Sequence, residues 1–102
     1  MIIMTIENPG RPFETLGLVR GSMIQSKHIG KDMAAGLKTL VGGELKGYTE
    51  MMEESREIAT QRMIGQAKVL GADAVVCVRY TSSSVMQGAA EVTAYGTAIK
   101  YK

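Results

Sequence analysis

Apolar residues recur along this chain with two different periods, and strand-like patterns come first. The stretch "MIIMTI" reads as a short strand, which "ENPGRP" ends because two prolines and a glycine force a turn or an irregular link. A longer strand follows in "TLGLVRGSMIQS", with Leu16, Leu18 and Ile24 on one phase and Val19 and Met23 on the other. Glycines inside this strand predict a bend, a bulge or a close approach of another backbone.

Helical spacing replaces alternation in the next segment, "KHIGKDMAAGLKTLV", which predicts a first helix with one apolar stripe. That stripe consists of Ile29, Met33, Leu37 and Leu40. Gly42 and Gly43 follow where this helix must stop, because glycine adopts the left-handed conformation of a helix C-cap without penalty.

A second helix of about 22 residues is predicted to begin at Thr49, whose hydroxyl can accept a backbone N–H as an N-cap. Glu50, Glu53 and Glu54 fall in its first turns, where carboxylates favour the positive end of the helix dipole. Gly71 is the expected C-cap. The apolar stripe of this helix is Met52, Ala59, Met63, Ala67 and Leu70.

Two strands close the chain. In "ADAVVCVRYTS" the apolar residues run from Val75 to Val78 without alternation, which predicts a strand covered on both faces. "SSVMQGA" reads as a hairpin connection and "AEVTAYGTAIKY" as the returning strand. The predicted order of elements is therefore β-β-α-α-β-β in a single domain over residues 1–102, near the commonest domain size.

Composition and charge exclude several classes of function. The formal net charge is +2, and Lys and Arg are spread among Asp and Glu without a basic stripe, so no nucleic acid partner is expected. No stretch approaches the roughly 20 apolar residues of a membrane helix, so no membrane partner is expected either. The single cysteine and the absence of a signal-peptide pattern predict a soluble protein in the cytoplasm. A domain this small gains much by burying surface against copies of itself.

The glycines that precede the second helix do not form a phosphate-binding loop. Such a loop follows a strand and carries a Lys-Ser/Thr pair after its last glycine. Here a predicted helix precedes the loop, and Tyr48 follows Gly47. The glutamates of the following helix would also repel an anion. These glycines are interpreted as a helix–loop–helix connection.

Metal binding has two weak candidate ligands, Cys77 and His28, which lie in different predicted elements. One thiolate and one imidazole cannot form a tetrahedral site within a single chain. A ring of identical subunits could gather several copies of either residue around an axis. The structural alternative is that Cys77 is a small buried hydrophobe and that His28 faces solvent.

No catalytic site is predicted. Cys77 and His28 could pair as nucleophile and base, but the sequence shows no environment that would activate the thiol. Glu53 and Glu57 share a helix face with Arg56 between them, a pattern that more often forms a solvated surface or a salt bridge than an acid–base pair.

The segment "VGGELKGYTEMMEESREIA" resembles the signature of the YbjQ-like family of small bacterial and archaeal proteins, a family also named for heavy-metal binding. "LGLVRGSMI", "GADAVVCVRY" and "AYGTAIKY" resemble strands of that family, so the resemblance covers nearly the whole chain in the same order. The signature residues are Val41, Gly42, Gly43, Tyr48 and Arg56.

The resemblance implies an α+β subunit with an antiparallel sheet and two helices, assembled as a ring-shaped homopentamer. It implies no mechanism, and the cofactor is unknown, with a metal ion as the candidate that the family label suggests. Our first hypothesis is a non-enzymatic oligomer that binds a metal ion or small ligand at subunit interfaces. The alternatives are an enzyme with a composite inter-subunit site that includes Tyr48 and Arg56, and a scaffold that binds another protein. In the structural interpretation, these two residues fix the loop and the subunit contact.

Overall fold

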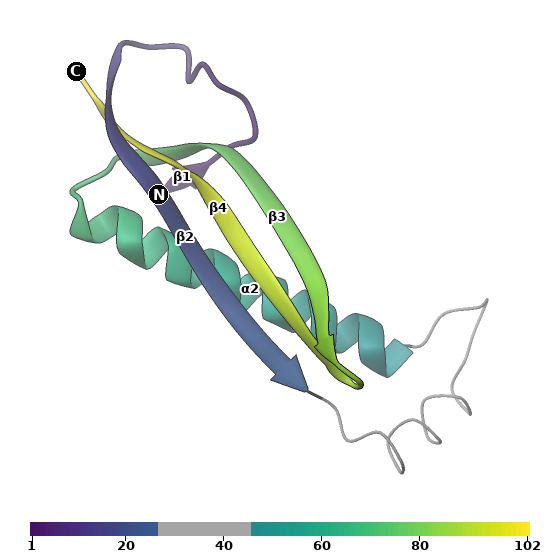
Figure 1. Cartoon of the computed structure of the whole chain (residues 1–102). Coiled ribbons are helices and arrows are strands. Elements are labelled where there is room, and N and C mark those ends of the chain that lie inside the picture. Colours follow the sequence, from purple (N-terminus) through teal and green to yellow (C-terminus); the bar gives the residue numbers. More distant parts are fainter. Residues whose placement is uncertain (27–45) are drawn as a thin grey trace.

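The computed structural model describes residues 1–26 and 46–102 and shows an α+β fold. Four strands form one mixed sheet in the order β1-β3-β4-β2, and a long helix lies along one of its faces (Figure 1). The elements are β1 (Ile2–Ile3), β2 (Phe13–Ser26), α2 (Lys46–Val69), β3 (Ala74–Met86) and β4 (Ala89–Tyr101). The predicted first helix, with its stripe from Ile29 to Leu40, lies outside the described residues.

The prediction of a purely antiparallel sheet is wrong at one strand. β2 and β3 both pair with β4 in antiparallel register, but β1 pairs in parallel with β3 through Ile2↔Ala74 and Ile3↔Val75. β1 is only two residues long, and an irregular segment connects it to β2. A short apolar run carries no information about strand direction, so the sequence could not specify this pairing.

The two faces of β2 both carry apolar residues, but they lie in different surroundings. Val19 is buried against α2 and Met23 packs beside the same core, whereas Leu18 and Ile24 are exposed on the other face of the sheet. The predicted irregularity within β2 is confirmed, because the register with β4 shifts between Thr15 and Gly17.

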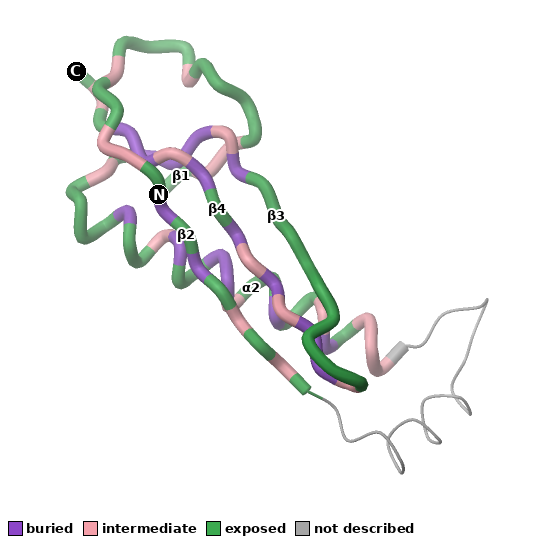
Figure 2. Tube along the Cα trace, viewed as in Figure 1, coloured by how far each residue is buried: buried purple, intermediate pink, exposed green. Residues whose placement is uncertain are grey.

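The main core lies between α2 and the sheet (Figure 2). Ala59, Met63 and Ala67 are fully buried along one stripe of α2, as the helical spacing predicts. Met52 is only partly buried, and Leu70 is exposed, so the predicted stripe is wrong at its last position. Leu70 follows the end of α2, where the chain no longer has the helical period.

Both predicted ends of this helix are tested by the structure. α2 begins at Lys46, so Thr49 lies within the first turn and is not the N-cap. The C-terminal prediction is confirmed, since Gly71 has φ +78° and donates its N–H to the Lys68 carbonyl at 3.0 Å. Ala72 donates to the Ala67 carbonyl at 3.0 Å, and this pair of hydrogen bonds is the Schellman motif that glycine permits.

A second, smaller cluster lies on the sheet face opposite α2, at the end where the N-terminal segment crosses it. Ala74, Val76 and Ile99 are buried there, with Met4 and Phe13 packed against them. β3 is therefore covered on both faces in its first half, because Val75 faces α2 and Val76 faces the N-terminal segment. This confirms what the unbroken apolar run predicts.

β3 continues further than predicted. It runs to Met86, so most of the expected connection "SSVMQGA" belongs to the strand, and only Gln87 and Gly88 form the turn. Gly88 has φ +78°, a conformation that a tight hairpin turn requires. The outer half of β3 is exposed along its length (Figure 2). Among the described residues, no helix is long and apolar enough to cross a membrane.

Candidate functional site

α2 carries the two signature residues that the structure describes. Tyr48 is half-buried in the first turn, and Arg56 is exposed two turns later. The backbone carbonyl of Arg56 accepts a hydrogen bond from the Thr60 hydroxyl at 2.7 Å, and the same hydroxyl lies 2.8 Å from the Tyr80 phenol oxygen on β3. Val41, Gly42, Gly43 and the candidate ligand His28 lie outside the described residues.

Cys77 lies at a β-bulge in β3, where the register with β4 shifts between Val76 and Arg79. Its φ of +56° is uncommon for a residue with a side chain and is typical of a bulge or a turn. Its N–H donates to the Ile6 carbonyl at 3.1 Å, and its Sγ lies 3.9 Å from the same oxygen. The thiol is half-buried beside the second cluster. It is therefore less enclosed than expected if Cys77 were simply a small buried hydrophobe.

Within the described residues, no three His, Cys, Asp or Glu side chains lie close enough to hold a metal ion. A soft metal ion needs several thiolate or imidazole ligands in one place. The described part of one chain therefore offers Cys77 as an isolated thiol. A site built on this residue would require ligands from further copies of the chain or from residues that the structure does not describe.

α2 lies very close to the sheet at Gly21 of β2. A Cβ atom at this position would overlap the backbone of Ala59 and Met63 and would lie 2.6 Å from the Arg62 Cβ. Because Gly21 has no side chain, α2 lies directly against the strand. Gln66 and Arg62 then reach the outer edge of β2, where Gln66 Oε1 accepts the Arg20 N–H at 2.9 Å and Arg62 Nη1 donates to the Ser22 carbonyl at 2.6 Å. The predicted close backbone approach in this strand is confirmed here.

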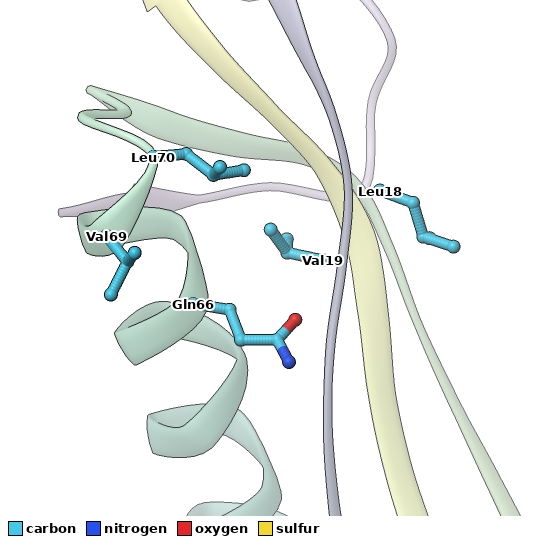
Figure 3. Close-up of a pocket in the computed structure, with 5 residues that line it drawn as sticks. All are labelled: Leu18, Val19, Gln66, Val69 and Leu70. Carbon is cyan, nitrogen blue, oxygen red and sulfur yellow. The ribbon is translucent and has the colours of Figure 1, made fainter.

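A pocket of about 300 Å³ opens where the last turn of α2 meets β2 (Figure 3). Figure 3 shows Val19 and Gln66 directed into the space between helix and strand, with Leu18 on the far side of the strand. The residues that line the pocket are Leu18, Val19, Gln66, Val69 and Leu70. Four of these five side chains are aliphatic, so the pocket suits an apolar group, with the Gln66 amide as its polar contact.

The rim of this pocket is unusually apolar for a protein surface. Val69 is 87% exposed and Leu70 beside it is also exposed, and Leu18, which is 66% exposed, projects from the other side of β2. Single exposed aliphatic residues are common, but a group of them around a pocket indicates a surface that another molecule covers. The sequence did not reveal this group, because its members come from β2 and from the end of α2.

Comparison with known proteins places this arrangement in a family. The family YbjQ, described as "Putative heavy-metal-binding", matches residues 1–102. The chain belongs to this family. The resemblance inferred from the signature segment is thereby confirmed over the whole chain.

Curated relatives in the YbjQ family carry names without a function. A UPF0145 protein of Clostridium novyi is 66% identical over 91 residues, which cover 89% of this chain and 88% of that protein. A UPF0145 protein of Thermotoga petrophila is 61% identical over 102 residues, which cover 98% of this chain and 96% of that protein. These names place the relatives in an uncharacterised family and state no activity.

A solved structure supports the fold. The crystal structure of a protein of unknown function from Pediococcus pentosaceus, assigned to the DUF74 family, has a TM-score of 0.76 to this chain. The two share 18% sequence identity, and the match covers 100% of this chain and 98% of that one. This similarity shows that the α+β fold occurs in an experimentally determined structure.

Proposed function

We propose that this member of the YbjQ family is a non-enzymatic, cytoplasmic protein that assembles into a ring of five copies and binds a metal ion or small ligand where subunits meet. The pentamer is what the family resemblance implies. The observation that carries the proposal is the apolar rim of the pocket, formed by Val69 and Leu70 at the end of α2 and by Leu18 on the far side of β2. In a subunit of 102 residues, covering this rim with a second copy removes apolar surface from water and stabilises the folded chain.

The family description supports a metal ion as the ligand, and Cys77 is the described residue best suited to bind one. Its thiol is half-buried and held at a defined bulge, and a ring would repeat it in every subunit. Several thiolates around an axis form the type of donor set that soft metal ions prefer. His28 remains the second candidate ligand from the sequence.

An enzyme with a composite inter-subunit site is the alternative. It is supported by the exposure of Arg56 and by the position of Tyr48 on the same helix, where both side chains could contact a neighbouring chain. A scaffold that binds another protein would use the same apolar rim. Both alternatives predict a ring without a retained metal ion.

Native mass spectrometry of protein purified without an affinity tag or chelator tests this proposal. We expect a pentamer that carries the mass of a bound metal ion or small molecule. If the ligand is a metal ion, Cys77→Ala should lose it and keep the ring, whereas Glu57→Ala, an exposed control position on α2, should keep both. A pentamer that carries no ligand and binds no added Zn²⁺ would contradict the binding function.

A further inference from the structure

The two outer edges of the sheet differ in how their backbone groups are satisfied. At the β2 edge, the Arg20 N–H donates to Gln66 and the Ser22 carbonyl accepts from Arg62. Both side chains come from α2, one helical turn apart, and reach the strand because Gly21 allows the helix to lie against it. A strand approaching this edge would have to displace both hydrogen bonds. The centre of the β2 edge is therefore closed.

The first half of the β3 edge is also closed, by the N-terminal segment of the same chain. Met4 donates its N–H to the Val75 carbonyl at 2.9 Å and accepts from the Val78 N–H at 3.0 Å. Cys77 donates to the Ile6 carbonyl, and Arg79 Nη1 donates to the Thr5 carbonyl at 2.9 Å. This cover follows the strand through the bulge and ends at Arg79.

Beyond Arg79, β3 is the outermost strand of the described sheet, and β1 pairs with it only at Ala74 and Val75. Backbone groups of successive strand residues point to opposite sides. The backbone N–H and C=O groups of Arg20 and Ser22 point away from β4. The backbone groups of their partners on β4, Tyr95 and Thr93, therefore point toward β3. There they pair with Arg79 and Thr81, whose backbone groups point toward β4. The outward-facing groups on β3 are therefore those of Tyr80, Ser82 and Ser84.

The sequence of this outer half lacks the features that normally protect a strand edge. Natural edges are blunted by lysine, proline or inward-pointing charges, or they are covered by another element. The residues from Tyr80 to Met86 read "YTSSSVM", with no charge and no proline, and they are exposed. Tyr80, Val85 and Met86 add exposed apolar surface beside the outward backbone groups.

We propose that the outer edge of β3 from Tyr80 to Ser84 is a subunit interface, to which a strand of a second copy of this chain adds by backbone hydrogen bonding. This inference rests on the proposed homo-oligomer and names the surface that it uses. In a ring, each contact joins two different surfaces, so this edge meets a strand other than β3 on its neighbour. Gln66 and Arg62 prevent the centre of the β2 edge from serving as that strand, which restricts the ways in which copies can pair.

Two proline variants at matched positions test the interface. Ser82→Pro removes an outward N–H from the β3 edge, and Ser22→Pro removes one from the β2 edge, while both leave the backbone hydrogen bonds to β4 in place. Ser22→Pro also removes the hydrogen bond between the Ser22 and Thr93 hydroxyls, so it is the more demanding of the two for the fold. We expect Ser82→Pro to reduce the subunit count in native mass spectrometry from five to one. Ser22→Pro should keep the wild-type count. Circular dichroism of both variants establishes that each one is folded.

The outcomes separate this inference from the proposed function. A wild-type monomer would contradict the oligomer itself. A wild-type oligomer that Ser82→Pro leaves intact would overturn the β3 interface alone, and so would an oligomer that Ser22→Pro dissociates. A wild-type dimer that only Ser82→Pro dissociates would support the interface and contradict the ring.

Hydrogen exchange of the unmodified chain provides a measurement that does not depend on the folding of a variant. The amides of Ser82 and Ser84 should exchange slowly in the assembled protein and rapidly after dilution to monomers. The amides of Thr81 and Ser83 point toward β4, so they should stay protected from exchange in both states and serve as internal controls. Rapid exchange at Ser82 in the assembled protein would overturn the inference.

Discussion

At the scale of single residues, Gly21 determines how the helix and the sheet meet. Its position on the phase of Val19 marks the face of β2 that α2 covers, and the absence of a side chain allows backbone contact. Both phases of this strand are apolar, so hydrophobic alternation could not identify the buried face. The glycine was the only local signal. Cys77 was harder to place, because nothing in the sequence around it indicates a β-bulge.

Substituting Gly21 should therefore destabilise the protein by a steric mechanism. The Cβ of Gly21→Ala would overlap the backbone of Ala59 and Met63, and we expect a loss of about 1–3 kcal/mol in the free energy of unfolding, typical of overpacking. Gly65→Ala is the matched control, because a Cβ there meets nothing within 4 Å and alanine favours a helix by about 0.8–1 kcal/mol. Urea unfolding measures both. Equal effects of the two substitutions would contradict the close approach.

At the scale of elements, the sequence predicted most of what the structure describes. The strands now defined as β2, β3 and β4 follow from apolar runs between glycine-containing turns, and the end of α2 follows from Gly71. The errors lie where local patterns are weak. The direction of β1 depends on a contact of only two residues. α2 begins at Lys46, before Thr49, because a capping preference is weak and the context of the fold can override it.

The contact between α2 and the sheet should provide much of the stability of the subunit. Met63 is among the largest fully buried side chains and lies at the centre of the main core. Met63→Ala should lower the free energy of unfolding by about 2–5 kcal/mol through lost burial and the cavity that it creates. Glu57→Ala, an exposed position on the same helix, should change it by less than about 0.5 kcal/mol. Equal melting temperatures of the two variants in thermal unfolding would contradict this view.

At the scale of the whole molecule, the described chain leaves two surfaces that suit further copies of itself. They are the apolar rim of the pocket and the outer edge of β3, and they come from elements distant in the sequence. For this reason, periodicity could predict the elements but not the candidate site. The signature residues gave the family, whereas the structure adds the positions of Tyr48, Arg56 and Cys77, and His28 lies outside the described residues.

The rim should respond to charge in the assembled state. Val69→Asp places a carboxylate in a surface that we expect a neighbouring subunit to cover, so the ring should dissociate at micromolar concentration. Val69→Leu keeps the surface apolar and should keep the ring. Size-exclusion chromatography with light scattering measures both variants. An unchanged assembly in Val69→Asp would place the subunit contact elsewhere.

The mass of the unmodified chain in solution decides between a ring of five copies and a single chain. Analytical ultracentrifugation over a range of protein concentrations gives this mass without a tag or a surface. With a chain of 11.0 kDa, we predict a predominant species of five times that mass, which dissociates to the single chain only on strong dilution. A single species of 11.0 kDa at all concentrations would contradict the ring and, with it, a ligand site shared between subunits.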